Sequence, residues 1–276
     1  MKVFETFKPA DILLQKYISY YYLDIADDEN YRNEYICYPH YNNTLSLYKS
    51  HKVSFGVNHS YVNFEEGILP LQIFTPLREN VLKVTQIGSV HKIGIVFEPF
   101  GINQFLKSDL AINERASSPN FSFFNDQFIN QLFEIENLEG LKLALDKELS
   151  SKFSVTTNLY ISKALELFHT SIDEISIDEL AEHKLGISRK HLNRLFKKYI
   201  GTSAQKYRSI VRFRQLMNHK LNLQQLDNLG TLSHQAHYTD QSHFIKACKQ
   251  LTGLTPSQFF KDGKIVGTED TFWKFT

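Results

Sequence analysis

The sequence predicts an α+β protein, with an N-terminal β-sandwich or small barrel, covering helices, and then an all-α domain. Residues 17–100 hold short runs of β-branched and aromatic residues, separated by Gly, Pro, Asn and Asp, which is typical of strands. From residue 158 onward apolar residues recur at helical spacing, and one segment of this part occurs twice. A chain of 276 residues is long enough for two such domains.

Seven strands are expected in the first hundred residues, because seven runs have strand composition. They read YISYYYLDI, EYICYPH, TLSLYKS, HKVSFGV, ILPLQIF, VLKVTQIG and KIGIVFEPF. Short strands at this spacing favour a sandwich or small barrel. The spacing then becomes helical, which predicts helices over residues 102–110, 125–135 and 138–153 that cover one end of the sheet.

A linker is expected at the text SSKFSVTTN, which is polar and rich in Ser and Thr, with a helix beginning near Thr157. We therefore expect one domain over residues 1–152, a second over residues 157–264, and a C-terminal tail over residues 265–276. The Phe-rich residues 120–133 are expected to belong to the core, with the lining of a ligand pocket as the alternative.

The composition, with 42% hydrophobic and 22% charged residues, indicates a globular chain. No run approaches the roughly 20 apolar residues of a membrane span. The text before Asp11 has no apolar run like that of a signal peptide, so a cytoplasmic protein is expected. Cys37 and Cys248 lie 211 positions apart, which favours packed thiols over a disulfide scaffold or a zinc module.

The internal repeat appears when the sequence is shifted by 52 residues. The shift places Gly201 on Gly253, and both are natural helix terminators. It also places Ser188 on Asp240, and both are N-cap candidates. Each copy reads as a short helix, a tight turn and a longer helix, which is the helix-turn-helix pattern.

The longer helix of each copy has one apolar and one polar face. In the first copy the apolar stripe is Leu192, Leu195, Phe196 and Tyr199, and in the second it is Phe244, Ala247, Cys248 and Leu251. Because successive residues turn by about 100°, Lys190, Arg194 and Lys197 point away from the first stripe. Lys246 and Lys249 repeat this outer face in the second copy.

One helix over residues 203–221 is expected between the copies, about 28 Å long at 1.5 Å per residue. This length is near the 34 Å that separates successive major grooves on one side of a duplex. One chain could thus offer both polar faces to adjacent grooves. Arg208 and Arg212 lie one turn apart on the polar side, where they contact phosphates or tie the two copies together.

The charge is divided between the two halves of the chain. Residues 1–150 carry 13 Lys and Arg against 19 Asp and Glu, a balance of −6, whereas residues 151–276 carry 18 against 11, a balance of +7. The 44 residues from 183 to 226 contain eleven Lys and Arg and no acid. Clustered basic residues favour a polyanionic partner because binding releases counterions from phosphates. The alternative is a solvated basic face without a partner.

The texts LAEHKLGISRKHLNRLFKKYIGTSAQKY and TDQSHFIKACKQLTGLTPSQFF resemble the two helix-turn-helix motifs of the AraC/XylS family of bacterial transcriptional regulators, over residues 158–261. Three features depart from the family pattern. His237 and Tyr238 stand where the family has Gly and Phe, and Cys248 stands where it commonly has Phe. The spacing from Ala181 to Leu192 is one residue longer than expected for the first motif.

The resemblance implies sequence-specific DNA binding, with one recognition helix of each motif in a major groove. In the first recognition helix it points to Arg189, Lys190, Asn193, Arg194 and Lys197. In the second it points to Gln241, Ser242, His243 and Lys246. Candidate phosphate contacts are Lys198, Arg208, Arg212 and Lys249. The implied partners are double-stranded promoter DNA and RNA polymerase, with no membrane.

The N-terminal half contains IGIVFEPFGINQFL, and its FEPFG resembles a segment of a sensor-like, cupin-type domain. This resemblance implies a domain that binds a small-molecule effector or pairs two copies of the chain. No effector residue can be named from the sequence. A regulator without a small ligand, whose sandwich binds another protein, is an open alternative.

An enzyme is not expected, because no GxSxG elbow, phosphate-binding glycine loop or His-Glu-x-x-His motif occurs. No cofactor, catalytic residue or metal is expected, since the histidines of the first half are scattered: His40, His51, His59 and His91. His234, His237 and His243 are expected to make turn or phosphate contacts, with a metal site as the alternative. A cupin-like enzyme with a DNA-binding tail is the alternative function.

Overall fold

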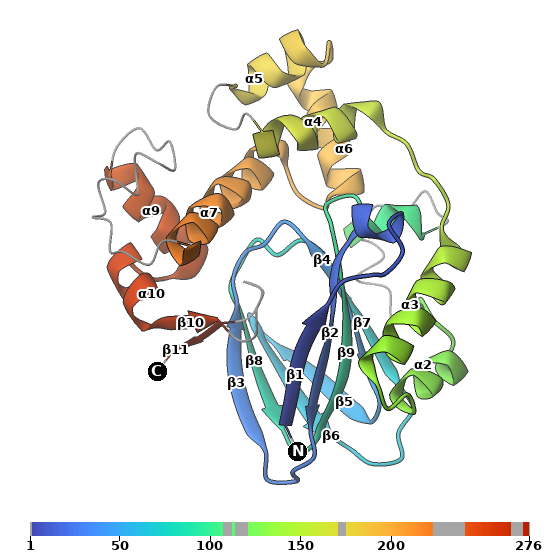
Figure 1. The fold of residues 1–276 in the computed structure, drawn as a ribbon. Helices are drawn as coiled ribbons and strands as arrows, with labels where there is room; N and C mark the ends of the chain where they lie inside the picture. The colour runs from blue at the N-terminus through green and yellow to red at the C-terminus, as the bar shows by residue number, and fades with distance from the viewer. Residues whose placement is uncertain are drawn as a thin grey trace.

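The computed structural model describes residues 2–106, 112–113, 121–170, 175–222, 241–265 and 273–275, without the side chains of 216–222, 241–244, 260, 262, 263, 265 and 273–275. Two sheets form a sandwich. Its strands within residues 2–106, together with α2 (Asp126–Phe133) and α3 (Leu138–Lys152), make the sandwich half, and two short strands after residue 262 join one of the sheets. A group of helices over residues 159–262, the helical half, lies against one end of the sandwich (Figure 1). The predicted α+β fold class is confirmed.

The sandwich consists of a five-stranded sheet in the order β1-β2-β9-β4-β7 and a six-stranded sheet in the order β10-β11-β3-β8-β6-β5. All neighbouring strands are antiparallel except β6 and β8. The strands are β1 (Lys2–Phe7), β2 (Ile18–Ala26), β3 (Arg32–Cys37), β4 (Asn43–Tyr48), β5 (His51–Gly56), β6 (His59–Phe64), β7 (Leu71–Thr75), β8 (Leu82–Ile87), β9 (Val90–Phe97), β10 (Gly263–Ile265) and β11 (Trp273–Phe275).

The seven predicted strands are β2, β3, β4, β5, β7, β8 and β9, and the sequence did not reveal β1, β6, β10 and β11. A tight turn after β5 explains the missed β6. Gly56 pairs with His59, so only Val57 and Asn58 form the loop, and Asn58 has a φ of 53°. Asn adopts this left-handed conformation more readily than most residues, which permits a two-residue hairpin turn.

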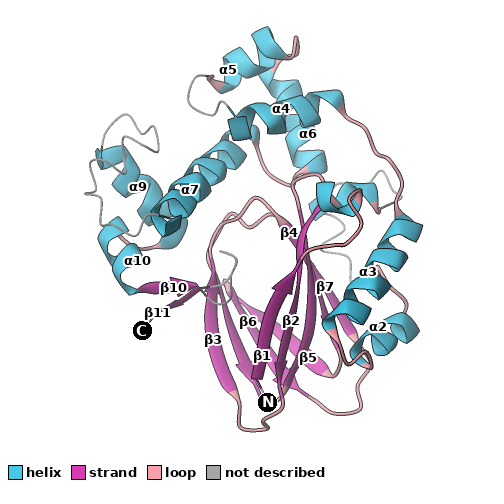
Figure 2. Ribbon diagram, in the orientation of Figure 1, coloured by secondary structure: helices cyan, strands magenta, loops and turns pink. Residues whose placement is uncertain are grey.

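The outer face of the five-stranded sheet is covered by α2 (Asp126–Phe133) and α3 (Leu138–Lys152) (Figure 2). Strand residues alternate between faces, so every second residue of β4 and β9 meets these helices. Leu45, Leu47, Ile93 and Ile95 are fully buried in one cluster with Leu145 of α3. Phe residues of the 120–133 segment join this cluster, which confirms the prediction that they belong to the core.

The inner face of the same sheet, which meets the six-stranded sheet, has a different composition. Tyr20, Tyr22 and Tyr48 form a cluster there with Tyr35 and Val84 of the opposite sheet. Aliphatic packing therefore holds the helices onto the outer face, whereas tyrosines and polar residues fill the space between the sheets.

The helix predicted over residues 102–110 is wrong at its start, where the structure has only a 3-10 turn, η2 (Ile102–Gln104). The carbonyl of Gln104 accepts a hydrogen bond from Ser154 N (2.7 Å) and its side chain bonds to Thr156. These long-range bonds use a carbonyl group that a continuing helix would need. Residues 107–110 lie outside the described residues.

The helical half consists of α4 (Leu159–Thr170), α5 (Ile177–Glu179), the π-turn η3 (Leu180–Lys184), α6 (Arg189–Tyr199), α7 (Ala204–Asn222), α9 (Gln241–Thr252) and α10 (Pro256–Asp262). α7 has 19 residues, as the sequence predicted. α4 follows the linker and is capped by Asn158, which accepts a hydrogen bond from Ile161 N (3.1 Å).

The two halves share one hydrophobic cluster. Tyr38, Leu77 and Phe100 of the sandwich pack with the helical residues of this cluster, and the Tyr38 ring lies 4.9 Å from that of Phe259. The last strand, β11, pairs with β3, so the end of the chain returns to the sandwich. Among the described residues, no helix is long and apolar enough to cross a membrane.

Candidate nucleic-acid interface

The first helix-turn-helix unit runs from α5 to α6, and side-chain caps set its helix starts. Ser176 accepts a hydrogen bond from Glu179 N (3.1 Å) at the start of α5, and Ser188 accepts one from His191 N (3.2 Å) at the start of α6. Both are N-cap bonds, and the one at Ser188 was predicted from the sequence. Gly186, with a φ of 67°, forms the turn between them.

A π-turn accommodates the extra residue of this unit. Leu185 N donates to Leu180 O (3.0 Å), which lies five residues earlier instead of four. A π-turn holds one residue more than an α-turn, so the longer spacing from Ala181 to Leu192 is absorbed before the turn. Leu192 is consequently fully buried.

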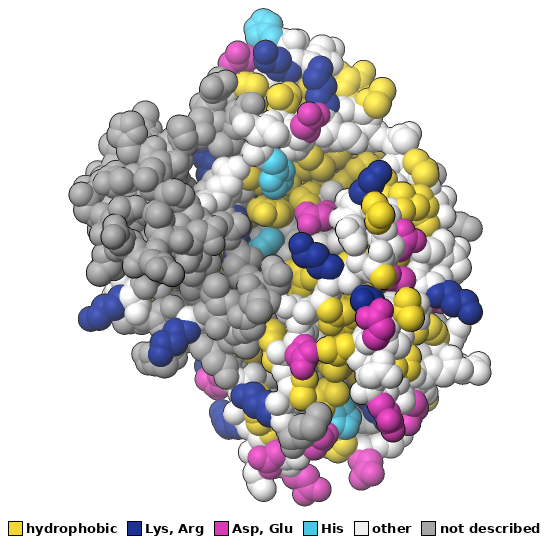
Figure 3. Space-filling view, in the orientation of Figure 1, with side chains coloured by type: hydrophobic (Ala, Val, Ile, Leu, Met, Phe, Trp, Pro, Cys, Tyr) yellow, Lys and Arg dark blue, Asp and Glu magenta, His cyan; other side chains and the backbone are white. Residues whose placement is uncertain are grey.

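α6 buries one face and exposes the other, as predicted. Leu192 and Phe196 are fully buried, whereas Lys190, Arg194 and Lys197 are exposed. The exposed side chains line an open hollow of about 780 Å³. Figure 3 shows Lys and Arg side chains at the top of the molecule, where α5 and α6 lie, and Asp and Glu scattered over the sandwich.

Two of the predicted DNA contacts on α6 already bond to other elements of the chain. The guanidinium of Arg189 donates to both carboxylate oxygens of Asp178 (3.0 and 3.2 Å). The side-chain oxygen of Asn193 accepts a hydrogen bond from Ala204 N (3.1 Å) at the start of α7. Asn193 therefore caps the connecting helix.

His191, which the sequence did not single out, lies in the hollow beside Arg194. The Arg194 guanidinium lies 3.3 Å from His191 Nδ1, within hydrogen-bonding distance. The spacing of these two residues, three positions apart on a helix, could have revealed the pair.

The second unit repeats the helix starts of the first. α9 begins 52 residues after α6, and α10 begins 52 residues after α7. Gly201 and Gly253 end the preceding helices with φ values of 92° and 78°. Ser203 and Thr255 cap the following helices through bonds to Lys206 N (3.2 Å) and Gln258 N (3.3 Å). Matching termini support the interpretation of a duplicated unit.

On the second recognition helix, α9, Lys246 and Lys249 are exposed, and Cys248 is buried. Gln241, Ser242 and His243 lie in the first turn of α9, but their side chains are outside the described part of the chain. The predictions for His234, His237, Tyr238 and Asp240 also fall outside it. The remaining phosphate candidates on α6 and α7, Lys198, Arg208 and Arg212, are half-buried.

α7 also joins the helical half to the sandwich, through a residue that the sequence did not single out. Arg214 is fully buried and donates to the carbonyl oxygens of Pro39 (2.7 Å) and Tyr38 (3.0 Å). Thr202, in the loop between α6 and α7, donates to the carboxylate of Glu79. The start and the middle of the connecting helix are therefore attached to loops of the sandwich.

Among the described residues, no group of three or more His, Cys, Asp or Glu side chains could hold a metal ion. Both described cysteines are buried free thiols. Burial raises the pKa of the Cys248 thiol to about 11, so it packs as a neutral group.

Comparison with known families identifies the class of this domain. Residues 182–262 match a family described as a helix-turn-helix domain, so the C-terminal part of the chain is such a domain. This match overlaps residues 158–261, which resemble the AraC/XylS motifs, and agrees with that resemblance.

Known proteins give more limited similarities. The Msm operon regulatory protein of Streptococcus mutans is 26% identical over 143 residues, and the match spans 49% of this chain and 49% of that protein. Two structures of ToxT from Vibrio cholerae cover 87% of this chain. One is 14% identical, covers 97% of ToxT and has a TM-score of 0.47. The other, with (E)-4-(8-methylnaphthalen-1-yl)but-3-enoic acid bound, is 12% identical, covers 98% of ToxT and has a TM-score of 0.44.

Proposed function

We propose that the protein is a sequence-specific DNA-binding transcriptional regulator of the AraC/XylS type, whose sandwich half modulates DNA binding. The observation that carries this proposal is the duplicated unit, in which α6 and α9 expose lysines and an arginine opposite a buried stripe. An α-helix fits the major groove, where Arg and Lys donate hydrogen bonds to guanine. The relative in Streptococcus mutans is named as an operon regulator, which agrees with this function.

The proposed contacts fall into two groups, according to whether the side chain bonds to another element of the fold. Lys190, Arg194 and Lys197 on α6 are the main candidates for the first groove, and Lys246 with the first turn of α9 for the second. Arg189 and Asn193 have structural roles, because their side chains already bond to Asp178 and to α7. Arg189 could still contact DNA if its exposed ion pair exchanged partners, since such pairs are weak.

The wider setting of this function is also a proposal. A bacterial regulator of this type acts in the cytoplasm on promoter DNA together with RNA polymerase, and a second copy of the chain would pair through the sandwich half. No described feature favours the alternative of a cupin-like enzyme with a DNA-binding tail. We therefore propose that the protein is not an enzyme.

DNA binding by the full chain tests the proposal. Bound genomic fragments would define the target sequence, and fluorescence anisotropy would then measure affinity for that duplex and for a random one. Arg194→Ala is expected to weaken specific binding by about 1–3 kcal/mol if the guanidinium reads a base. Lys197→Ala is expected to weaken both duplexes equally and to lower the salt slope by about one unit.

Lys52→Ala is the matched control, because this lysine is exposed on the sandwich half, and it should change neither affinity. Equal losses on both duplexes for Arg194→Ala would reassign this residue to a phosphate. Absence of any duplex binding by the intact chain at low ionic strength would refute the proposed function.

A further inference from the structure

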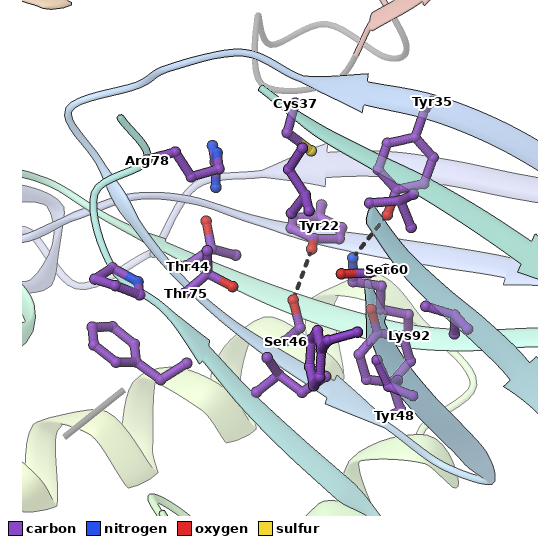
Figure 4. Close-up of a pocket in the computed structure, with 18 residues that line it drawn as sticks. Tyr22, Tyr35, Cys37, Thr44, Ser46, Tyr48, Ser60, Thr75, Arg78 and Lys92 are labelled. Carbon is purple, nitrogen blue, oxygen red and sulfur yellow. Dashed lines mark hydrogen bonds between the residues drawn. The ribbon is translucent and has the colours of Figure 1, made fainter. Parts of the chain in front are cut away.

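A cavity of about 400 Å³ lies between the two sheets, and residues of both sheets line it (Figure 4). One part of its wall is apolar and includes Val53, Val62, Ile73, Leu82 and Val84. Phe55 also lines the cavity and is 70% exposed, so the cavity reaches solvent near this residue. The volume is within the range of small-molecule sites in proteins, about 300–1,000 Å³.

Among the described residues, the lining of the cavity holds two cationic side chains, Lys92 and Arg78, and no Asp or Glu. The two cations differ in how the protein stabilises them. The Lys92 ammonium lies 5.1–5.9 Å from the ring centroids of Tyr22, Tyr35 and Tyr48 and donates to Tyr35 Oη (3.4 Å). Burial alone would lower the pKa of Lys92, but the surrounding tyrosines outweigh it and raise the pKa, so the side chain stays charged.

Arg78 lacks such compensation. Its side chain is 8% exposed, and neither Nε nor Nη2 has a hydrogen-bond acceptor among the described residues. An arginine does not lose its proton in a protein, so a full positive charge stays in the cavity wall. Nε–H and one Nη2–H form one edge of the guanidinium, where two parallel donors match the two oxygens of a carboxylate.

A second polar group, which brings the unpartnered atoms to three among the described residues, lies in the same cavity. The hydroxyl oxygen of Thr44 is buried and makes no hydrogen bond there. Figure 4 shows Arg78 and Thr44 on the same side of the cavity. Buried polar groups are nearly always satisfied, so three such atoms in one cavity indicate an acceptor that is not among the described residues.

We propose that the cavity between the sheets binds a small carboxylate with an apolar body, whose carboxylate pairs with the Arg78 guanidinium and accepts a hydrogen bond from Thr44. This rests on the proposed function, since it assigns a chemical class to the effector of the sandwich half. The apolar part of the ligand lies against the aliphatic wall, and Lys92 adds a second positive charge to the site.

The position of Arg78 in the chain links this site to the DNA-binding helices. Its neighbour Leu77 belongs to the hydrophobic cluster shared with the helical half, and Glu79 accepts the hydrogen bond of Thr202. Cys37 lines the cavity, and the next two carbonyls bond to Arg214. A ligand that shifts Arg78 therefore acts on the same short segments that hold α7, and its binding is expected to change DNA affinity.

Calorimetry on the full chain tests the ligand class. The probes are straight-chain carboxylates of four to ten carbons, benzoate and phenylacetate, each beside its neutral primary amide. At least one carboxylate is expected to bind, with its amide at least about tenfold weaker, because charge-assisted hydrogen bonds are the stronger ones. Equal binding of acid and amide, binding of no carboxylate, or equally tight binding of inorganic phosphate would overturn the proposal.

Variants locate the site. Arg78→Gln should abolish carboxylate binding, and Arg78→Lys should weaken it because the paired donors are lost while the charge remains. Arg32→Gln, at an exposed arginine on β3 of the sandwich half, is the control and should bind as the parent does. Thr44→Val should weaken carboxylate binding by a smaller factor, and it replaces Arg78→Gln in the test if that variant does not fold. Unchanged binding by a folded Arg78→Gln protein would refute the assignment.

The link to DNA is tested separately with Glu79→Gln. This variant should bind the carboxylate within about twofold of the parent, while the ligand no longer changes DNA affinity. A full ligand effect in this variant would refute transmission through Glu79. DNA binding without ligand is measured for the parent and for every variant. If the parent binds DNA but no carboxylate, the ligand site is refuted. If neither the parent nor any variant binds DNA, the proposed function is refuted.

Discussion

The two faces of the five-stranded sheet use the same strands for different purposes. On the outer face, Ile93 and Ile95 of β9 are fully buried against α2 and α3. On the inner face, Lys92 and Gly94 of the same strand meet tyrosines and a cavity. Because side chains alternate along a strand, one segment can supply both a close-packed core and a hollow charged site. Along β9, one set of alternating residues therefore stabilises the fold, and the other set faces the proposed ligand site.

The largest difference is expected from truncating an isoleucine on each face. Ile95→Ala should lower the free energy of unfolding by about 2–5 kcal/mol, because it leaves a void in a fully packed cluster. Ile73→Ala borders the existing cavity and should cost about 1 kcal/mol, mostly the lost transfer term. Urea unfolding measures both. Equal losses would show that the inner face is as tightly packed as the outer.

A pH effect of up to about 3 kcal/mol is expected from His51 on β5, whose ring contacts Tyr48 of the inner face. Burial, with smaller contributions from His91 and Lys92, lowers its pKa to about 4, whereas the unfolded chain titrates near 6.5. Between pH 6.5 and pH 4 the unfolded state binds more protons than the folded state. The free energy of unfolding is therefore largest above pH 6.5 and decreases as the pH falls to about 4.

Urea unfolding from pH 7 to pH 4 measures this loss, and His51→Gln should flatten the profile. The His51 Nε2–H donates to Ser89 O (3.0 Å), a bond that the Gln amide can replace. A profile of unchanged slope in the variant would assign the loss to other groups, such as His169, whose pKa burial also lowers.

Gly94→Ala adds a methyl group to the inner face and is expected to cost about 1–3 kcal/mol. A Cβ at this position would lie 1.9 Å from Tyr22 Cε1, so the ring would have to move into the cavity. The unfolding temperature and the affinity for the carboxylate should both decrease. Gly56→Ala on β5 is the control, since its Cβ would make only ordinary contacts, the nearest at 3.7 Å. If Gly94→Ala changes neither the unfolding temperature nor the affinity for the carboxylate, the inner face tolerates repacking.

The smallest effect on stability is expected from Lys92→Met, within about 1 kcal/mol of the parent. The variant loses contacts of the ammonium with tyrosine rings, but it also removes the cost of burying a charge. Carboxylate binding should nevertheless weaken, since one of two positive charges leaves the cavity. A large loss of stability would show that Lys92 is a structural residue of the sandwich.

Local signals made the helical half predictable. Caps such as Ser188 and terminators such as Gly201 act over a few residues, so the sequence alone located α6 and the length of α7. The exposed face of Lys190, Arg194 and Lys197 followed from helix geometry. The bonds of Arg189 and Asn193 were not predictable, because their partners come from other elements.

The cavity was beyond the reach of sequence reasoning. Arg78 stands in the text TPLREN, which reads as an ordinary loop, and its burial depends on the bridge between His40 and Arg78. Lys92 reads as an exposed strand residue until the pairing of β9 with β2 and β4 places it between the sheets. Sheet order and register are long-range properties that alternation within one strand does not specify.

The return of β10 and β11 to the edge of β3 gives the helical half two covalent attachments to the sandwich, one before α4 and one after α10. A swing of all the helices as one body would strain both anchors. The bonds of Thr202 and Arg214 add a non-covalent attachment at α7, between the two covalent ones. The helical half is therefore tethered to the sandwich at several points along its length, and not at the linker alone.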